Sequence, residues 1–551
     1  MFARSFSVLL VLLVVLAPFW QPQAQQRPRR IQPEQREGNA VAEKKYILGQ
    51  MPELFTYEEL VELGTVDEIR APLKEKLNAV LTTPFISNDA FYREIRPVRP
   101  NVSGLGTSLR MVMWNIERGL RFEDVKLLLT NKDQFLKRLD QNDVKPGSDE
   151  YEEVVRQIDL LQSADVLVLQ ELDWGLKRTE YHEVVRELGA AMRMNWAYGV
   201  EFIEIDPINL GIEEFAEALP EDREEMRKQI AVDKQRLRCL HGNAVFSRYP
   251  ILKATLQPLR VQGYNWYEGE KKRVTDLEKG KRVVSEKVFL EKIRREIRRG
   301  GRTLLTVTLD VPDLPEKQLT VAAPHLENHC KPARRQEQMR EVLGYLRNIK
   351  NPLILAGDFN TSLRDDKPTS VKREVNKRVG SGEFWSKQGL KYATGVGLVF
   401  DVLAGGINFF KNQHDPTVKH VPVVAPNPEE GLFRVLENFR FDDGFCFDFR
   451  GSNDRSSNGL EGTLANSNQR AAKGFAVTYE VERTIGPVGK LKLDWIFVKP
   501  YIIDPRDPNG PYRFAPHFAR TLEEVNYAVE DRISDHNPLV VDLPFSEPKL
   551  K

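Results

Sequence analysis

Residues 352–360 read Pro-Leu-Ile-Leu-Ala-Gly-Asp-Phe-Asn, an apolar run that ends in two polar residues, Asp358 and Asn360. The run is short and rich in Leu and Ile, which is typical of a buried strand. Alternation along an extended segment places Asp358 and Asn360 on the same side of the chain. The segment therefore predicts a core strand that carries a carboxylate and an amide to one edge of a sheet.

Five more short signatures place polar residues at the ends of strand-like runs. Residues 109–115, 165–170 and 319–325 have their polar residues last, in Met113-Trp114-Asn115-Ile116-Glu117, Gln170-Glu171 and His325-Leu326-Glu327. In Leu493-Asp494-Trp495 and Ser534-Asp535-His536-Asn537-Pro538 the polar residues come before the apolar run. If these two strands run antiparallel to the other four, all six signatures share one edge, and we expect that arrangement.

This set of side chains suits the hydrolysis of a phosphate ester. The reaction needs charge neutralisation, an oriented water and help for the leaving oxygen, all close together. Hard oxygen ligands such as Glu171 and Asp535 favour Mg²⁺, with Mn²⁺ or Ca²⁺ as alternatives, and no cluster of thiolates competes. The signatures together predict a phosphoesterase that uses a divalent metal.

The same motifs, in the same order, resemble those of the endonuclease/exonuclease/phosphatase family. This family includes DNase I-like nucleases, abasic-site endonucleases, neutral sphingomyelinases, inositol-polyphosphate phosphatases and deadenylases. The resemblance covers residues 108–543, and six motifs in family order are far more specific than one Gly-Asp-Phe-Asn segment. It implies an α/β (α+β) fold of the DNase I-like kind, a four-layer sandwich of two packed mixed β-sheets flanked by helices.

The resemblance implies that four residues lie on the metal side of the site. Asn115 and Glu171 match the metal-end positions of the first two strands, and Glu171 is the residue we expect to bind the ion directly. Asp535 matches a further contact to the metal or to water. Glu117 matches a position at which several family members have Asp or another polar residue, and we expect it as a second ligand.

Five further residues are implied to act on the phosphate. Asp358 matches the carboxylate that orients or deprotonates the attacking water, and Asn360 matches a donor to a phosphate oxygen. Asp494 and His536 match a pair in which the acid fixes the imidazole tautomer and favours its charged form. His325 matches the group that stabilises the phosphate or protonates the leaving group. Nucleases of the DNase I kind carry His there, whereas abasic-site enzymes carry Tyr.

Two more residues are candidates for substrate contact. Asn243 lies where the family has a strand that runs past the site, and Arg178 follows the Gln170-Glu171 signature and would supply positive charge. A surface Arg is nevertheless common, and an isolated Asn after a strand usually belongs to a turn. The catalytic interpretation is favoured by the six motifs in family order rather than by any single residue.

Charge is distributed unevenly, although the net charge of the 551-residue chain is only +1. Residues 201–225 contain ten acidic residues and one basic residue, whereas residues 271–302 contain thirteen basic and five acidic residues. Val284, Val288, Ile293 and Ile297 approximate a helical stripe, which predicts a basic amphipathic helix. With the aromatic segment at its start, the region 264–302 suits contact with a polyanion or an anionic membrane surface. The alternative is a solvated helix that forms salt bridges with the acidic stretch.

The N-terminus predicts export. An apolar run from Phe6 to Phe19 follows Arg4, which is typical of a signal peptide over residues 1–25 and implies a secreted or periplasmic enzyme. An uncleaved anchor is the alternative. We expect a linker and a small helical extension over residues 26–105, with helices at 56–63 and 66–81. A catalytic domain over 106–545 follows, with insertions near 201–240, 263–302 and 362–490.

Other expectations concern the helices, the cysteines and the substrate. Helices are predicted at 122–139, 149–161, 181–192 and 333–349. Three cysteines permit one disulfide at most, and we expect a monomer. A nuclease is favoured by His325 and the basic insertion, and a sphingomyelinase-like phospholipid phosphodiesterase fits the same features. A catalytically silent binding protein on the same fold is a third hypothesis, against which the near-complete set of polar residues argues.

Overall fold

The computed structural model of this chain describes residues 46–212, 231–270, 296–314, 316–361, 428–449, 477–485, 488–502 and 512–546. The expected signal peptide, most of the linker and large parts of the three expected insertions lie outside the described residues. No helix in the described ranges has the length and apolar content that a membrane span requires.

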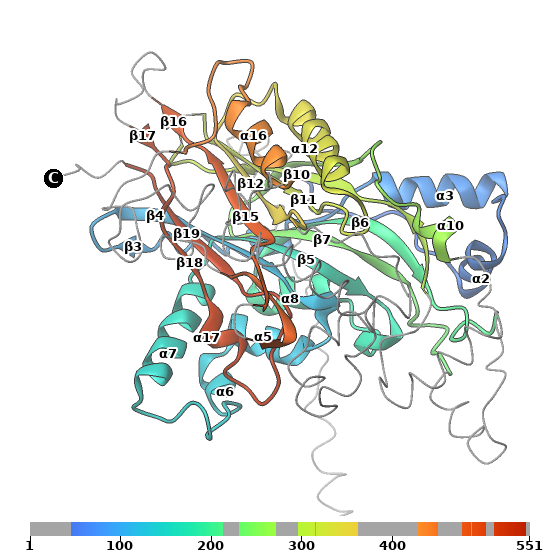
Figure 1. The fold of residues 1–551 in the computed structure, drawn as a ribbon, viewed down its shortest axis with the longest axis horizontal. Helices are drawn as coiled ribbons and strands as arrows, with labels where there is room; N and C mark the ends of the chain where they lie inside the picture. The colour runs from blue at the N-terminus through green and yellow to red at the C-terminus, as the bar shows by residue number, and fades with distance from the viewer. Residues whose placement is uncertain are drawn as a thin grey trace, which may run out of the picture. The chain divides into compact units, whose positions relative to one another are not determined.

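Two sheets form the centre of the described structure (Figure 1). The larger sheet contains, in order, β1 (Gly49–Gln50), β2 (Phe85–Ser87), β6 (Asn195–Ile205), β7 (Leu240–Ser247), β5 (Val166–Trp174), β4 (Gly106–Asn115), β19 (Leu539–Pro544) and β18 (His517–Thr521). β3 (Asn101–Val102) pairs with β4, and β9 (Ile297–Gly300) pairs with β6. The second sheet contains, in order, β15 (Asp494–Lys499), β12 (Leu353–Asp358), β11 (Gln318–Pro324), β10 (Thr303–Asp310) and β8 (Ile251–Pro258).

Strand directions bring the six signatures to one edge. β4 runs parallel to β5, and β11 runs parallel to β12. β19 is antiparallel to β4, and β15 is antiparallel to β12, with Asp494 opposite Asp358 in the register. Residues after the first four strands therefore meet residues before the last two, as the sequence predicted.

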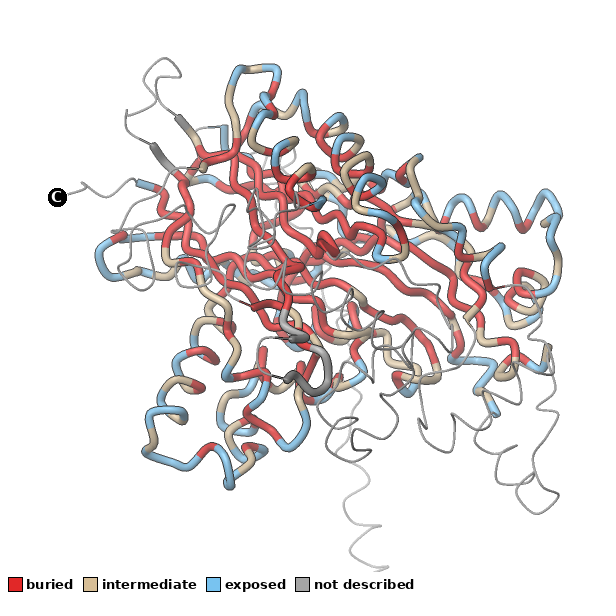
Figure 2. The backbone as a smooth tube through the Cα atoms, in the orientation of Figure 1, coloured by how far each residue is buried: buried red, intermediate tan, exposed pale blue. Residues whose placement is uncertain are grey.

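The apolar runs are buried on both faces, which explains why they lack a polar alternation. Met111 and Met113 of β4 face the core between the sheets, together with Ile354 of β12. Val112 and Trp114, which alternate with them, belong to the core on the outer side of the larger sheet. Figure 2 shows the buried strands at the centre and exposed residues on the surrounding helices.

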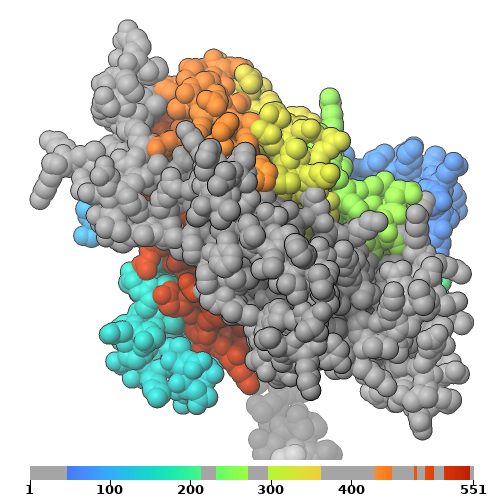
Figure 3. Space-filling model, in the orientation of Figure 1, coloured from blue at the N-terminus to red at the C-terminus, as the bar shows by residue number. Residues whose placement is uncertain are grey.

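Helices form the two outer layers. The larger sheet shares its outer core with α2 (Tyr57–Thr65), α3 (Ala71–Thr82), α5 (Phe122–Thr130), α6 (Lys132–Leu136), α7 (Asp149–Gln162), α8 (Val184–Met192) and α17 (Glu523–Asn526). The second sheet is covered by α12 (Pro332–Leu346) and α16 (Glu430–Asn438), which contact each other and lie side by side in Figure 3. Four layers are thus present, and the expected DNase I-like sandwich is confirmed.

Several helix boundaries differ from those expected. The predicted helix at 66–81 begins only at Ala71, because Pro72 occupies its first turn and Arg70 is extended. The predicted helix at 122–139 breaks at Asn131, whose side chain accepts a hydrogen bond from Gln134 N at 3.1 Å and so caps α6. The helix expected at 181–192 begins at Val184.

The predicted basic helix is wrong at its C-terminal end. Residues 297–300 form strand β9, which pairs with residues 202–205 of β6. The acidic and basic stretches therefore meet in a sheet rather than on a solvated helix. Residues 271–295, where the rest of that helix was expected, lie outside the described residues.

Candidate active site

Two β-bulges displace the carboxylates of Glu171 and Glu201 from regular strand positions. Asn243 of β7 opposes both Gln170 and Glu171 of β5, so Glu171 sits in a β-bulge with a positive φ of 57°. A second register shift, between Val200 and Phe202 of β6, isolates Glu201 in the same way. These bulges bring Glu171 and Glu201 to the edge where the signatures meet.

Gln170 ties the two sheets together beneath the site. Its side-chain amide donates to Pro324 O at 2.8 Å, and its Oε1 accepts from Asp358 N at 2.6 Å. Gly357 lies against this link, because a Cβ atom there would come within 2.0 Å of Pro324 O. The buried amide thus fixes the end of β11 relative to the end of β12.

Asp358 lies at the centre of the cluster and is only 2% exposed. Its Oδ2 atom is 3.7 Å from His325 Nε2, 3.8 Å from His536 Nε2 and 3.4 Å from Asn115 Nδ2. Burial, followed by the proximity of Asp494, raises the pKa of Asp358 to about 6. The carboxylate is therefore poised to exchange a proton near neutral pH.

His536 is held from both sides. Its Nδ1 is 2.7 Å from Asp494 Oδ2, its backbone N–H donates to Ser534 Oγ, and its carbonyl accepts from Trp114 Nε1. Burial disfavours the charged ring, but Asp494 outweighs that effect and raises the pKa of His536 well above its ordinary value. The expected carboxylate–imidazole pair is therefore present in the structure.

Glu171 forms the open side of the cluster. Its Oε1 lies 3.2 Å from Asn115 Nδ2 and 3.9 Å from His325 Nε2, and its side chain is 26% exposed. Burial opposes ionisation, yet positive charge on His325 and His241 when they are protonated, and on Arg118, lowers the pKa of Glu171 below its ordinary value. An ionised carboxylate that faces outward is a suitable ligand for a cation.

The remaining metal-side residues lie beside this group. Asp535 Oδ1 is 4.0 Å from His536 Nε2, and Asp535 N donates to Glu117 Oε2 at 3.1 Å. Glu117 N in turn donates to Asn115 Oδ1. Hard oxygens from these residues and Glu171 fit a divalent ion such as Mg²⁺, and the buried Asp494 Oδ1 has no hydrogen-bond partner among the described residues.

The two asparagines expected near the phosphate are both tied to the backbone. Asn360 donates its amide to Leu326 O at 2.9 Å, and its backbone N–H donates to Asp358 Oδ1 at 2.7 Å. Asn243 accepts from Glu171 N through Oδ1, while its buried Nδ2 has no hydrogen-bond partner in the described part of the chain. Asn243 thus has a donor available near the carboxylate it positions.

Arg178 is not brought to this cluster. Its guanidinium pairs with Asp173 through two nitrogens, at 2.6 and 2.7 Å, and also with Glu204 and Glu296. The donors of Arg178 are engaged in these ion pairs. Contact between Arg178 and substrate stays a prediction. No sequence signal revealed these partners, because Arg178 and Asp173 lie outside both charged stretches and Glu296 is an acid within the basic one.

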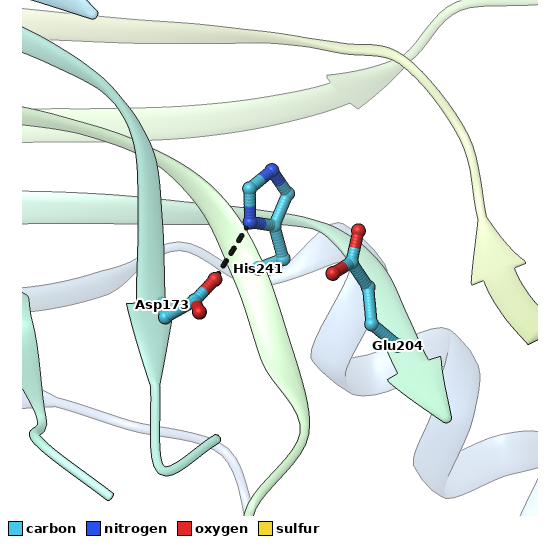
Figure 4. A group of neighbouring side chains, drawn as sticks. All are labelled: Asp173, Glu204 and His241. Carbon is cyan, nitrogen blue, oxygen red and sulfur yellow. Dashed lines mark hydrogen bonds and ion pairs between the residues drawn. The ribbon is translucent and has the colours of Figure 1, made fainter. Parts of the chain in front are cut away.

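Asp358, Asp494 and His536 form one group of two acids and a histidine. Figure 4 shows a second such group, Asp173, Glu204 and His241. His241 Nδ1 lies 2.9 Å from Asp173 Oδ1, and Glu204 pairs with Arg298 at 2.8 Å as well as with Arg178. Arginines already neutralise both acids, so the group does not require a metal.

Aromatic residues of the second insertion are packed inward. Trp266, in α10 (Trp266–Glu270), is buried under Arg298, whose Cζ lies 3.9 Å from the ring centre. Arg299 Cζ lies 3.3 Å from the ring centre of Tyr267. The expectation that this segment stacks on bases or enters a membrane is therefore not supported by these residues, which pack against arginines of the same chain.

Comparison with known proteins agrees with this arrangement. The family model described as Endonuclease/Exonuclease/phosphatase family matches residues 114–536. No curated protein matches the chain.

Similar solved structures have low identity and low TM-scores. An endonuclease/exonuclease/phosphatase from Beutenbergia cavernae is 16% identical, with 80% of this chain and 72% of that chain covered and a TM-score of 0.30. The human nocturnin catalytic domain is 14% identical, with 79% and 93% covered and a TM-score of 0.31. D. rerio TDP2 with single-strand DNA product is 13% identical, with 79% and 98% covered and a TM-score of 0.27. Family membership therefore follows from the sequence match, which spans well over half of the chain: the protein belongs to the endonuclease/exonuclease/phosphatase family.

Proposed function

We propose that this protein is an exported, metal-dependent phosphodiester hydrolase that attacks its substrate with an activated water. The observation that carries the proposal is the position of Asp358, a buried carboxylate between the imidazoles of His325 and His536. Among the described residues no Lys or Arg forms an ion pair with it, so its charge is free to act on a substrate.

Asp358 is suited to act as the general base. A base works best when its pKa is near the working pH, and the pKa of about 6 places Asp358 in that range. Oδ1 is occupied by the backbone N–H of Asn360, so Oδ2 is the atom that would take the proton from water. The water oxygen then bonds to phosphorus as its proton moves to Asp358, while the bond from phosphorus to the leaving oxygen breaks and that oxygen takes up a proton from a neighbouring imidazole or from solvent.

The two imidazoles are suited to bind phosphate oxygens. Both present Nε2 to Asp358 Oδ2, at 3.7 and 3.8 Å, and Asp494 keeps His536 charged. Donors held in place before reaction stabilise charge that develops on the phosphate. Glu171, Asn115, Asp535 and Glu117 would hold a divalent ion, which supplies further charge neutralisation when it is bound.

A polynucleotide is the substrate class that we propose first, with a phospholipid phosphodiester as the alternative. The proposal rests on His325, the residue that nucleases of the DNase I kind carry at this position. Residues 298–302 give it no additional support, because Arg298 and Arg302 are paired with Glu204 and Glu201. The silent binding protein is disfavoured, and the proximity of Asn115, His325 and His536 to Asp358 Oδ2 supports the hydrolase instead.

Nicking of supercoiled plasmid by protein without residues 1–25 tests the proposal, with Mg²⁺ and with EDTA. His536→Gln should lower the rate about 10²- to 10⁴-fold. His182→Gln is the matched control, because His182 is also paired with a carboxylate, at 2.9 Å from Glu187, but lies before α8 and stacks on Phe122 of α5. Bis(p-nitrophenyl) phosphate and sphingomyelin vesicles serve as parallel substrates.

The outcomes separate the hypotheses. Mg²⁺-dependent nicking that is lost in His536→Gln and kept in His182→Gln supports the nuclease. Cleavage of sphingomyelin without nicking replaces it with the phospholipid enzyme. Absence of all three activities contradicts phosphodiester hydrolysis and favours the binding protein. Export is tested separately by the N-terminal sequence of the mature protein, which should begin after about residue 24.

A further inference from the structure

An arginine, rather than an acid, lies closest to the inner nitrogen of His325. Arg302 Nη1 is 2.8 Å from His325 Nδ1, whereas the nearest carboxylate oxygen, Glu201 Oε2, is 3.3 Å away. All three side chains are buried, with His325 only 1% exposed. The contact differs in kind from that of His536, whose Nδ1 faces Asp494.

A guanidinium at this distance restricts where the imidazole proton can be. Arginine stays protonated in proteins and has donors but no acceptor, so the contact is a hydrogen bond only if Nδ1 of His325 accepts. A proton on Nδ1 would point two donors at each other across 2.8 Å. Burial opposes the charge of Arg302, but Glu327 and Glu201 raise its pKa further above its ordinary value. Arg302 is therefore a permanent donor here.

Arg302 has little freedom to turn away from the ring. Its Nη1 also donates to Glu201 Oε2 at 3.0 Å, and its Nε donates to Glu327 Oε2 at 3.3 Å. Glu327 is fixed in turn by the indole N–H of Trp266, at 2.9 Å. The bulge at Glu201 and the packing of Trp266 thus determine the direction in which the guanidinium points.

We propose that Arg302 is a positioning residue that keeps the ring proton of His325 on Nε2 and off Nδ1. This inference rests on the proposed function of the site, which it deepens by assigning the state of one imidazole. The proton then points to the side of the ring where Glu171 and Asp358 lie, 3.9 and 3.7 Å away. His325 thus offers its Nε2–H to the phosphate, whereas the Nδ1 atom of His536 is held by Asp494.

The tautomer can be observed without any activity. Long-range ¹H–¹⁵N correlation spectra of ¹⁵N-histidine protein distinguish a protonated ring nitrogen from an unprotonated one, and His325→Gln assigns the signals among eight histidines. We expect a protonated Nε2 and an unprotonated Nδ1. A protonated Nδ1, alone or together with Nε2, would overturn the proposal.

A double variant tests whether Arg302 causes this state. Arg302→Met with Glu327→Gln removes one positive and one negative charge, and it leaves Glu201 as the remaining partner of Nδ1. The proton should then move to Nδ1, and kcat should fall about 10- to 100-fold with little change in KM. Trp266→Phe is the control, because it removes a hydrogen bond from the same network but keeps the contact between Arg302 and His325.

Each outcome has a distinct meaning. An unchanged tautomer in the folded double variant would show that Arg302 is merely structural and contradict the proposal. If the double variant does not fold, the wild-type spectrum still decides the assignment. A protonated Nε2 in a protein without phosphodiesterase activity would leave the tautomer standing and refute the proposed function instead.

Discussion

Two buried groups in this protein contain the same residue types, two acids and a histidine, and they differ in what neutralises the acids. Histidines are the ion-pair partners of Asp358 and Asp494, and no Lys or Arg among the described residues pairs with either. Asp173 and Glu204 are instead paired with Arg178, and Glu204 also with Arg298. The first group keeps unneutralised charge, whereas the second is an internal ion-pair network.

The difference also determines the direction of the pKa shifts. The pKa of Asp358 is raised, because burial and Asp494 both disfavour its charge. Burial acts in the same direction on Glu204 and Glu296, but their arginines prevail and lower both pKa values, that of Glu296 to about 2. A cluster of acids and histidine is therefore a candidate for chemistry when it lacks fixed counter-charges, since fixed ion pairs already use the charge that a substrate or metal would need.

The largest effect is expected from Asp358→Asn. The amide keeps the shape and the hydrogen bond from Asn360 N but cannot accept a proton from water, so kcat should fall by about 10³-fold or more. Steady-state rates on the substrate that the nicking and vesicle assays identify measure this effect. A near-wild-type kcat in a folded Asp358→Asn protein would contradict the proposal that the Asp358 group performs the chemistry.

Asp173→Asn should affect stability more than chemistry. The substitution breaks the two-nitrogen contact with Arg178 inside a buried network, and loss of one partner of a buried pair costs about 3–5 kcal/mol. Urea unfolding followed by circular dichroism gives the free energy of unfolding. If Asp173→Asn leaves that free energy within about 0.5 kcal/mol of wild type, the second group is not the structural network described.

The same Asp358→Asn variant should be more stable than wild type at neutral pH. A folded-state pKa of about 6 exceeds the ordinary 3.8, so wild type loses stability as pH rises from about 4 to 6. The advantage of the variant should be absent below pH 3.8, grow through this window and reach about 1–3 kcal/mol above pH 6. Unfolding curves of metal-free protein across pH measure it.

Glu296→Gln should change the pH dependence of stability in the opposite direction. Its folded-state pKa of about 2 lies below the ordinary 4.5, so the stability it contributes is full above pH 4.5 and is lost as pH falls toward 2. The variant should be less stable than wild type at pH 7 and approach it in acid. Equal pH dependence for Asp358→Asn and Glu296→Gln would show that the two groups do not differ in counter-charge.

The edge at which the signatures meet was predictable from the sequence, but the ion-pair network behind it was not. Asp358, Asp494 and His536 were predictable because each adjoins an apolar run whose strand direction follows from the position of its polar residue. Glu201 and Arg302 escaped notice because each is one charge in a long charged stretch. Their role depends on a bulge and on pairing between distant strands, neither of which has a local signal.

The prediction of a basic helix was wrong at residues 297–300 for the same physical reason. Apolar residues in the stretch 284–297 approximate a helical period, but residues 297–300 pair with residues 202–205 of β6, where Arg298 forms an ion pair with Glu204. Backbone hydrogen bonds to a neighbouring strand and a buried ion pair outweigh a weak periodic preference. Charge complementarity between the two stretches was the one usable signal, and it predicted their contact but not its form.

The smallest effect that we expect is the stabilisation of the folded protein by bound metal, which distinguishes the two groups. Mg²⁺ at a free concentration ten times its Kd should stabilise the folded protein by about 1.4 kcal/mol. The stabilisation should be seen as a rise in Tm of a few degrees or less. Glu171→Gln should abolish this rise, because it removes the outward-facing carboxylate beside Asn115. Glu204→Gln should keep it, since the arginines already occupy that acid. The reverse pattern would place the metal in the Asp173, Glu204 and His241 group and make Glu171 a structural residue.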